Sequence, residues 1–405
     1  MKLKFFLICL TVLLAFYQGH AQRKSKTPYL LVLSMDGFRW DYIDSFPTPN
    51  FHRLVAKGVK AKSLIPSFPS VTFPNHYTMA TGLYPDHHGI VHNSFYDSTL
   101  HTTYRLGDRK TVEDGRFYGG EPIWVSAENQ NVRAACFYWV GSEAQGMHPT
   151  YWKQYDKKVT FEQRIDTVIQ WLTLPENNRP HLVMFYYDQP DKVSHETGPF
   201  SPETRAMVMR MDTLAGIFLD KIEKLSIHNQ LNVIFTSDHG MGEISNIRKI
   251  ILDDYIKKEW CLRITGHNPV FMLDAKAGCT DSIFGILTAV PHMKVWKKHN
   301  VPSQLHFGSN ARIGELIVLA DSAYALGWQG DKTENAGAHG YDPVNTDMHG
   351  IFFASGPAFK KGYLTSSFEN IHLYSIFAST LHLKPAPNDG NINQVKDIFI
   401  GYKPK

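Results

Sequence analysis

The sequence predicts an α/β fold built on a mainly parallel central sheet with helices on both faces. Apolar runs of strand length alternate with amphipathic segments of helical length across most of the 405 residues. The runs at 181–187 and 231–235 are almost continuously hydrophobic, as expected of parallel strands buried on both faces. Asp and His residues follow both runs, and open α/β sheets place their active sites at the carboxyl ends of parallel strands.

The individual elements follow from local patterns. A strand is predicted at 29–35, where an apolar run stops at Asp36-Gly37 and glycine lets the chain turn tightly. Pro74 lies near the start of a predicted helix at 75–81, because proline suits the first helical turn. Another strand is predicted at 348–354. Apolar residues at helical spacing predict further helices at 48–57, 161–174, 203–225 and 370–381.

The segment 252–330 differs from the rest of the chain and is predicted to be an inserted subdomain. It contains two cysteines, many turn residues and short strands such as 270–273 and 315–320. A chain of this length exceeds what a single core usually accommodates. We therefore predict one large domain formed by residues 28–251 and 331–401, interrupted by the insertion at 252–330.

The first 21 residues have the pattern of a secretory signal peptide. A short basic start at Lys2 and Lys4 precedes the apolar run Phe5–Phe16, and small residues end at Ala21. The run is shorter than the roughly 20 apolar residues of a membrane span, and no later stretch approaches that length. The mature protein is predicted to be soluble, without a transmembrane segment, and periplasmic or secreted.

Composition limits the partners and the cysteine chemistry. The 42 basic and 38 acidic residues nearly balance, so nothing suggests a stable nucleic-acid partner bound through a basic face. Signal cleavage would leave Cys136, Cys261 and Cys279, an odd number. In an oxidising compartment, three cysteines are expected to form one disulfide and leave one free thiol. Cys261 and Cys279 are a candidate pair.

Two separated fragments each combine a carboxylate with an imidazole after a predicted strand. Asp191 precedes His195 by four residues, and Asp238 stands directly before His239. Carboxylate oxygen and neutral imidazole are ligands that suit Zn²⁺. Asp36, at the end of the strand 29–35, is either a third ligand or an ordinary turn aspartate. Together the fragments indicate a two-metal hydrolase site.

Thr72 stands at the amino-terminal start of the predicted helix near Pro74. Backbone N–H groups and the positive end of the helix dipole lie beside a hydroxyl in that position, where a phosphate could also dock. The alternative is that Thr72 only caps the helix. A threonine hydroxyl is a weak nucleophile at neutral pH, and coordination to zinc would activate it. Two zinc ions roughly 4 Å apart would suit an in-line displacement at phosphorus.

Several separated motifs now carry a family resemblance. From about Tyr29 to Leu383 the chain resembles the nucleotide pyrophosphatase/phosphodiesterase family of the alkaline phosphatase superfamily, and it looks like a bacterial-type member with a single catalytic domain. The motifs, in family order and near family spacing, are Asp36-Gly37, Thr72-Phe-Pro-Asn-His-Tyr77, Gly82-Leu-Tyr-Pro-Asp-His-His-Gly89, Asn93-Ser-Phe-Tyr-Asp97, Gly120-Glu-Pro-Ile-Trp124, Pro190-Asp-Lys-Val-Ser-His195, Ser237-Asp-His-Gly240 and His339-Gly-Tyr-Asp342.

The resemblance implies an alkaline phosphatase-like α/β/α sandwich in which the insertion is a small cap on the pocket rim. It also implies two zinc ions per chain. One would be held by Asp191, His195 and His339, and the other by Asp36, Asp238 and His239 with the Thr72 oxygen. His349 is a rival to His339, but His339 stands in the Gly-Tyr-Asp setting that matches the family motif.

The resemblance further assigns substrate contacts. Asn93 would donate a hydrogen bond to a non-bridging phosphate oxygen, and Phe73, Trp139 and Tyr155 would surround a nucleoside. Without the resemblance, Trp139 and Tyr155 would be taken as core residues. Relatives often carry an acidic residue where this chain has Gln189, which bears on substrate preference.

The expected function is an exported two-zinc phosphodiesterase that converts nucleotides and dinucleotides to nucleoside 5′-monophosphates through a phosphothreonine intermediate. One alternative is a phospholipid or glycerophosphodiester hydrolase of the same family, with choline head groups as substrates. A second alternative, from another class, is a catalytically silent protein that binds zinc or nucleotide. The sequence leaves the oligomeric state and the cellular metal open.

Overall fold

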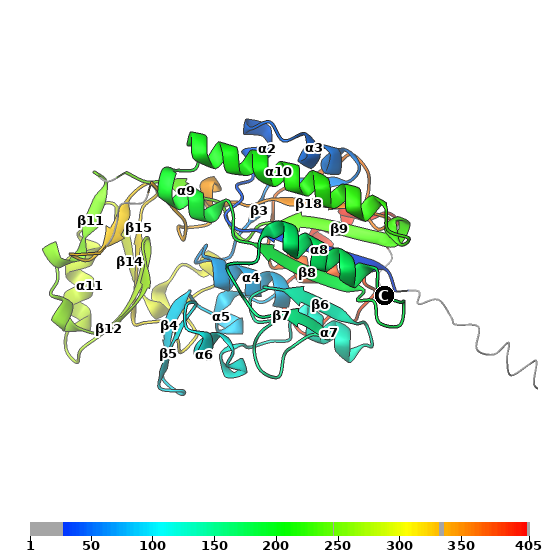
Figure 1. Cartoon of the computed structure of the whole chain (residues 1–405). Coiled ribbons are helices and arrows are strands. Elements are labelled where there is room, and N and C mark those ends of the chain that lie inside the picture. Colours follow the sequence, from blue (N-terminus) through cyan, green and yellow to red (C-terminus); the bar gives the residue numbers. More distant parts are fainter. Residues whose placement is uncertain (1–26, 246, 332–335, 403–405) are drawn as a thin grey trace, which may run out of the picture.

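The computed structural model describes residues 27–245, 247–331 and 336–402, so the predicted signal peptide at 1–21 lies outside the described residues. Its centre is an eight-stranded sheet in the order β19-β2-β18-β9-β1-β8-β6-β7 (Figure 1). The strands are β1 (Tyr29–Met35), β2 (Val59–Ala61), β6 (Ala134–Phe137), β7 (Tyr151–Lys153), β8 (Leu182–Tyr187), β9 (Leu231–Thr236), β18 (Phe352–Ser355) and β19 (Tyr363–Thr365).

The sheet is mainly parallel, as predicted. β1 pairs in parallel with β8 on one side and β9 on the other, whereas β18 runs antiparallel to both β9 and β2. In this register Ser34 lies opposite both Tyr186 and Thr236. Because the three central strands end at the same level, the residues that follow them meet at one edge of the sheet.

Helices cover both faces of the sheet and enclose two hydrophobic clusters (Figure 1). Residues of α3 (Pro49–Ala56), α8 (Phe161–Leu172) and α10 (Pro202–Glu223) pack on one face, and residues of α4 (Thr72–Thr81), α7 (Ile123–Asn129) and α12 (His372–Thr380) pack on the other. Each face presents alternate residues of the strands, as Leu31 and Leu33 do on one side and Leu30 and Val32 do on the other. The short helices are α2 (Tyr42–Ser45), α5 (Pro85–His88), α6 (Arg109–Val112) and α9 (Asp191–Thr197).

A second sheet with its own hydrophobic cluster forms within the predicted insertion. Its order is β12-β13-β15-β14, all antiparallel, and β16 pairs in parallel with β11, which lies just before the predicted insertion. The elements are β11 (Lys249–Ile251), β12 (Cys261–His267), β13 (Val270–Ala275), α11 (Thr280–Thr288), β14 (Met293–Lys297), β15 (Leu316–Ala320) and β16 (Ala325–Gly327). The small pairs are β3 (Leu64–Ile65) with β20 (Phe368–Glu369), β4 (Ser94–Asp97) with β5 (Thr102–Arg105), and β10 (Gly242–Glu243) with β17 (Gly337–Ala338).

A buried ion pair connects the segment before β15 to the small β4–β5 pair. Arg312 Nε donates to Asp97 Oδ2 at 2.7 Å, and its Nη1 donates to the Gly89 carbonyl at 2.8 Å. Asp97 Oδ1 also accepts from the N–H groups of Thr99 and Leu100. The carboxylate is 5% exposed, so losing its charge leaves the guanidinium without its partner.

Replacing Asp97 with asparagine is expected to lower the free energy of unfolding by about 2 kcal/mol at pH 7. Burial alone would raise the pKa of Asp97, but the Leu100 N–H and the Arg312 guanidinium outweigh burial and lower it. The carboxylate therefore contributes fully above its unfolded pKa of about 4 and loses that contribution as pH falls through the lower folded pKa. Urea unfolding of both proteins from pH 7 downward should show a difference that shrinks below about pH 4; a constant difference would contradict the assignment.

The state of the cysteines differs from the expected one disulfide and one free thiol. Among the described residues, Cys136, Cys261 and Cys279 are all free thiols, so the candidate Cys261–Cys279 disulfide is not formed in this structure. Burial raises the pKa of Cys261 to about 11 and also raises that of Cys136. Neither buried thiol is therefore activated. No helix in the described part of the chain combines the length and apolar character needed to cross a membrane.

Candidate active site and metal centre

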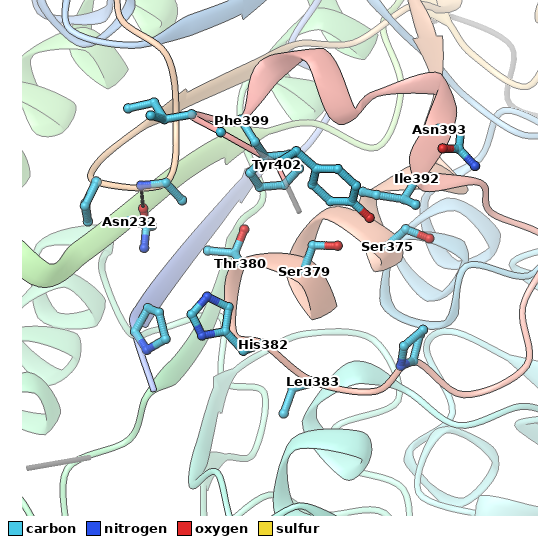
Figure 2. A pocket seen from close by; sticks show the side chains of 16 residues that line it. Asn232, Ser375, Ser379, Thr380, His382, Leu383, Ile392, Asn393, Phe399 and Tyr402 are labelled. Atoms are coloured by element: carbon cyan, nitrogen blue, oxygen red, sulfur yellow. Dashed lines mark hydrogen bonds between the residues drawn. The ribbon is translucent and has the colours of Figure 1, made fainter. Parts of the chain in front are cut away.

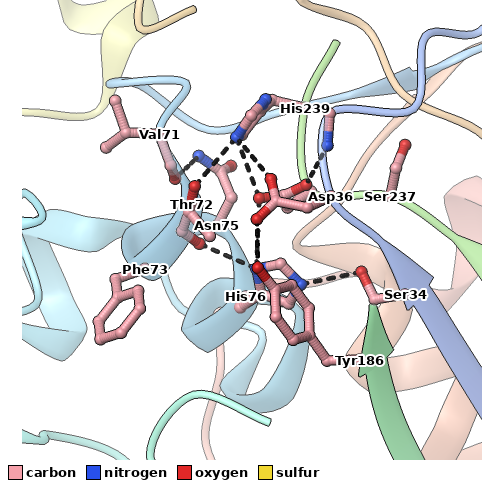
Figure 3. Close-up of polar contacts among 12 residues, drawn as sticks. Ser34, Asp36, Val71, Thr72, Phe73, Asn75, His76, Tyr186, Ser237 and His239 are labelled. Carbon is pink, nitrogen blue, oxygen red and sulfur yellow. Dashed lines mark hydrogen bonds and ion pairs between the residues drawn. The ribbon is translucent and has the colours of Figure 1, made fainter. Parts of the chain in front are cut away.

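Thr72 is the first residue of α4, immediately after the extended residue Val71. Its Oγ1 lies 3.2 Å from His239 Nε2, and Figure 3 shows the two side chains facing each other. The predicted helix start at 75 is thus three residues too late, since proline at the third position of α4 is compatible with its first turn. Asn93 is buried nearby, and its Oδ1 accepts from the Phe73 N–H at 2.9 Å.

Three predicted ligands from two strand ends converge beside Thr72. His239 Nε2 lies 3.3 Å from Asp36 Oδ1 and 3.1 Å from Asp238 Oδ2. All three side chains are buried, and their ligand atoms lie within 4.8 Å of one another. Asp36 follows β1 and Asp238 follows β9, the neighbouring parallel strand, which explains the convergence.

The other predicted ligands form a second group around Asp191. Its Oδ1 lies 3.3 Å from His195 Nε2 and 3.4 Å from His339 Nε2. The ligand atoms of Asp191, His239 and His339 also lie within 4.8 Å of one another. His239 therefore belongs to both groups of possible metal ligands. The rings of His239 and His339 are stacked with centroids 3.6 Å apart. The structure therefore brings the predicted ligands and Thr72 together.

Backbone carbonyls fix the orientation of each imidazole in these groups. The Nδ1 atoms of His195, His239 and His339 lie 2.8–2.9 Å from the carbonyl oxygens of Gly337, Gly240 and Ser70, respectively. A carbonyl only accepts, so each Nδ1 carries a proton, and in the neutral form of each ring the Nε2 lone pair points toward the carboxylates. Metal-binding histidines have this arrangement.

The carboxylate oxygens in the centre lack hydrogen-bond donors. Asp36 Oδ1, Asp191 Oδ1 and Asp238 Oδ2 are buried and accept no hydrogen bond within the described residues. Each of these oxygens lies close to the Nε2 atom of a histidine. Both atoms are hydrogen-bond acceptors when the imidazole is neutral, so the contact is unfavourable unless a cation lies between them. The residues thus fit divalent metal ions, which would supply the missing positive charge.

Burial and the charges of neighbouring groups together shift the pKa values in this cluster. Burial, together with the charges of Asp238 and Asp191, raises the pKa of Asp36 well above its ordinary value. Burial would lower the pKa of His195 and His239, but the adjacent carboxylates raise both. The cluster is therefore short of positive charge, which is the condition under which buried carboxylates bind cations.

Sequence reasoning missed Tyr186, whose hydroxyl donates to Asp36 Oδ2 at 2.5 Å (Figure 3). Tyr186 lies within β8 in register with Ser34, and a tyrosine in an apolar strand gives no signal of such a contact. The Nδ1 atom of His76 lies 3.3 Å from Asp238 Oδ2, and its Nε2 is 2.9 Å from Ser34 Oγ, so His76 supports a predicted ligand from outside the cluster.

Replacing Tyr186 with phenylalanine should weaken metal affinity by about 10-fold, the lower end of the usual effect of losing a partner that orients a ligand. The change removes only the hydroxyl that holds Asp36 Oδ2. Competition with a chromogenic chelator would measure the affinity. Tyr77→Phe is the matched control, because the Tyr77 hydroxyl is also buried but has no hydrogen-bond partner among the described side chains and backbone. Equal affinities for Tyr186→Phe and wild type would refute this role.

The predicted base-contacting aromatics occupy different environments. Phe73 is partly buried and follows Thr72, and Tyr155 is 40% exposed with its ring 4.9 Å from that of Tyr138. Trp139 is 1% exposed, and its Nε1 donates to the His76 carbonyl. Because no open ring face remains on Trp139, these contacts support a packing role and give no support to base stacking by this residue.

Other histidines and a separate cavity lie outside the metal centre. His349, the rival to His339, makes hydrogen bonds to Ser63 and to the Pro343 carbonyl.

A cavity of about 840 Å³ lies between the start of β9 and the C-terminal segment, where Asn232 Oδ1 accepts from the Ala358 N–H (Figure 2). Because Pro28 and Asn232 stand at the amino ends of their strands, this cavity is at the edge of the sheet opposite to Thr72 and its neighbours.

Sequence comparisons agree with this geometry. A family model described as type I phosphodiesterase / nucleotide pyrophosphatase matches residues 30–342. Human ectonucleotide pyrophosphatase/phosphodiesterase family member 5 is 34% identical over 381 residues, which cover 93% of this chain and 79% of the relative. Human family member 1 is 34% identical over 399 residues, 94% of this chain, but the chain spans only 43% of that relative's length.

Solved structures show the same fold. Murine ectonucleotide pyrophosphatase/phosphodiesterase 5 superposes with a TM-score of 0.88 at 33% identity, covering 92% of this chain and 100% of that chain. An inactive variant of the murine protein in complex with AMP gives a TM-score of 0.89 at 32% identity, with the same coverage. The central sheet is thus that of the alkaline phosphatase superfamily, and the chain belongs to the type I phosphodiesterase/nucleotide pyrophosphatase family.

Proposed function

We propose that this chain is a two-zinc phosphodiesterase that hydrolyses nucleotides and dinucleotides to nucleoside 5′-monophosphates, with Thr72 as its nucleophile. One observation carries the proposal. Beside the Thr72 hydroxyl, the Nε2 atoms of histidines lie close to carboxylate oxygens that accept no hydrogen bond from the described residues. Buried acceptors arranged in this way require cations, and a hydroxyl at a helix start is well placed to meet a phosphate.

Two donor sets would hold the ions. Asp191, His195 and His339 would hold one, and Asp36, Asp238 and His239 would hold the other with Thr72 Oγ1; the oxygen and nitrogen donors are those that zinc accepts. When bound, zinc neutralises developing negative charge and lowers the pKa of a coordinated hydroxyl. The candidate metal groups share His239, which supports two ions close together.

The protein's own residues divide the remaining work. Thr72 Oγ1 attacks phosphorus, the bond to the departing alcohol or phosphate breaks, and a phosphothreonine forms. Water then attacks phosphorus from the side opposite Thr72, and the bond from phosphorus to Thr72 Oγ1 breaks. A proton from the water regenerates the Thr72 hydroxyl, and the nucleoside 5′-monophosphate is released. Because Asn93 Oδ1 is occupied by the Phe73 N–H, its amide nitrogen remains available to donate to a non-bridging oxygen of the phosphate.

A nucleotide is the substrate class that the surroundings favour. Phe73 follows the nucleophile directly, and the ring of Tyr155 is 40% exposed. Burial raises the pKa of Tyr155 and nearby acidic groups raise it further, so its ring remains neutral and able to stack on a base. The solved relative with bound AMP adds support by analogy.

Export and domain organisation complete the proposal. A signal peptide at 1–21 would direct the chain to the periplasm or the medium, in keeping with relatives named as ectonucleotide enzymes. The segment 252–330 would form the cap, because most of its strands belong to a sheet separate from the central one.

Substrate preference provides the direct test. Zinc-loaded protein should hydrolyse the nitrophenyl ester of thymidine 5′-monophosphate with a kcat/KM at least 10-fold above that for nitrophenyl-phosphorylcholine, since stacking contributes roughly 1–3 kcal/mol per base. Tyr155→Ala should reduce this preference, whereas Tyr255→Ala, a change of an equally exposed tyrosine in the insertion, should leave it unchanged. Preference for the choline ester would assign the protein to lipid head groups.

A further inference from the structure

The segment that carries Tyr155 leaves the central sheet at the same edge as the metal centre. One row of paired residues crosses β1, β8, β6 and β7, and it consists of Leu33, Phe185, Phe137 and Lys153. Asp36 lies three residues beyond this row and Tyr155 two residues beyond it, so both follow the carboxyl ends of their strands. Neighbouring strands are roughly 4.8 Å apart, which separates the backbones of β1 and β7 by about 14 Å. Only an extended substituent, such as a nucleoside, could therefore reach Tyr155 from a phosphate at the metal centre.

A series of contacts connects Tyr155 to a predicted metal ligand. The centroid of its ring lies 4.9 Å from that of Tyr138, and the guanidinium carbon of Arg164 lies 4.9 Å from the Tyr138 ring centroid. Arg164 Nη1 donates to the Tyr186 carbonyl at 2.8 Å, and the Tyr186 hydroxyl donates to Asp36 Oδ2. The ring of Tyr155 is thus part of the packed layer that ends at the metal centre.

The backbone of Tyr155 is fixed, although its side chain is not buried. The Tyr155 N–H donates to Glu143 Oε2 at 3.0 Å, and the carbonyl of the next residue, Asp156, accepts from the Tyr138 hydroxyl at 3.2 Å. The side chain of Tyr155 is 40% exposed, and its ring is tilted by 60° against that of Tyr138. An exposed ring on a fixed backbone makes a pre-formed stacking surface, because little conformational entropy is lost when a base binds.

An ion pair holds Glu143 in turn. Arg109 Nη2 donates to Glu143 Oε2 and, at 2.6 Å, to Glu113 Oε1. Glu113 Oε1 also accepts from Gln154 Nε2 at 2.8 Å, so one guanidinium fixes both carboxylates that hold Gln154 and the residue after it. Glu143 is only 7% exposed, and a buried carboxylate is stable in such a place when it is paired and hydrogen-bonded.

We propose that Glu143 is a positioning residue for substrate binding, which holds the backbone of Tyr155 so that the ring is already placed to stack on the base of the nucleotide. The inference rests on the proposed function. Glu143 would act through Tyr155 and would touch neither the phosphate nor the metal ions. Stacking is present both before and during the reaction, so its loss raises KM and leaves kcat unchanged.

Two diesters with the same leaving group test this role. For zinc-loaded Glu143→Ala, the KM for the nitrophenyl ester of thymidine 5′-monophosphate should rise by about 10-fold, while kcat stays within about 2-fold of wild type. For methyl nitrophenyl phosphate, kcat/KM should equal that of wild type, because the methyl group cannot reach Tyr155. Glu143→Gln keeps an acceptor for the Tyr155 N–H and loses only the charge that pairs with Arg109. It should give a smaller rise in KM, and it provides the measurement if Glu143→Ala does not fold.

A matched control and a double variant separate positioning from general stability. Glu128 Oε1 accepts from the Thr150 N–H at 2.8 Å, so it holds a backbone N–H at the amino end of β7 instead of beyond its carboxyl end. Glu128→Ala should therefore have wild-type KM values for both diesters. In a Tyr155→Ala background, Glu143→Ala should cause no further rise in KM, because the ring through which Glu143 acts is absent.

The outcomes distinguish this inference from the proposed function. Equal losses with both diesters in Glu143→Ala would reveal a general structural effect and overturn the assignment. An unchanged KM for the thymidine ester, or a full additional effect in the Tyr155→Ala background, would overturn it as well. A wild-type protein that shows no preference for the thymidine ester over the methyl diester is a different result, since it would refute the nucleotide preference and the role of Glu143 together.

Discussion

Replacing Thr72 with alanine should reduce turnover of the nitrophenyl thymidine ester by about 10⁴-fold or more, the loss expected when a covalent nucleophile is removed. The hydroxyl lies 3.2 Å from His239 Nε2 at the start of α4, so its loss deletes the attacking atom without disturbing a core contact. Metal content should stay at the wild-type level, because six carboxylate and imidazole ligands remain. Steady-state kinetics and metal analysis on the same sample provide the measurement.

Two further variants sharpen this experiment. Thr72→Ser keeps a hydroxyl at the same position and should retain part of the activity. Thr81→Ala removes a buried threonine from the same helix, whose hydroxyl donates to the Tyr77 carbonyl and accepts from the Leu83 N–H, and should leave turnover within about 3-fold of wild type. Substantial activity in Thr72→Ala would show that another group attacks phosphorus, and the proposed mechanism would then be wrong.

The fold was predictable wherever local pattern and tertiary environment agree. The strand expected at 29–35 is β1 (Tyr29–Met35), and the helix expected at 203–225 is α10 (Pro202–Glu223). The strand expected at 348–354 begins only at Phe352, because His349 is held by Ser63 and the Pro343 carbonyl. Contacts between distant segments cannot be read from the local sequence. The boundaries of helices and strands were therefore predicted less accurately than their types.

The site was predictable through its side chains but not through its backbone. Strand-end Asp and His residues indicated the ligands, and parallel pairing of β1 with β9 explains why Asp36 meets Asp238. The carbonyl of Ser70, which orients His339 from 269 positions away, has no sequence signature because every residue has a carbonyl. Trp139 illustrates the converse, since the family resemblance placed it beside a nucleoside, whereas its ring is buried, as expected of a core residue.

Removing metal from the purified protein should abolish turnover and lower its melting temperature, and zinc add-back should restore both. Zinc at a concentration 1,000 times its dissociation constant stabilises the folded state by about 4 kcal/mol per site, which corresponds to a shift of about 5 °C or more for a chain of this size. The physical reason is that Asp36, Asp191 and Asp238 present buried oxygens without donors, and their repulsion is uncompensated once cations leave.

Single-ligand variants decide whether two ions are bound. Asp238→Asn should lower zinc content from about two ions per chain toward one, because Asp238 belongs to one candidate group and Asp191 to the other. His349→Asn is the matched control, since His349 is a buried histidine whose nitrogens bond to Ser63 and the Pro343 carbonyl rather than to the cluster. That variant should keep its full zinc content. A chelated wild type with unchanged melting temperature and turnover would show that the opposed acceptors are satisfied by protons, and the chemistry at Thr72 would then have to proceed without a metal.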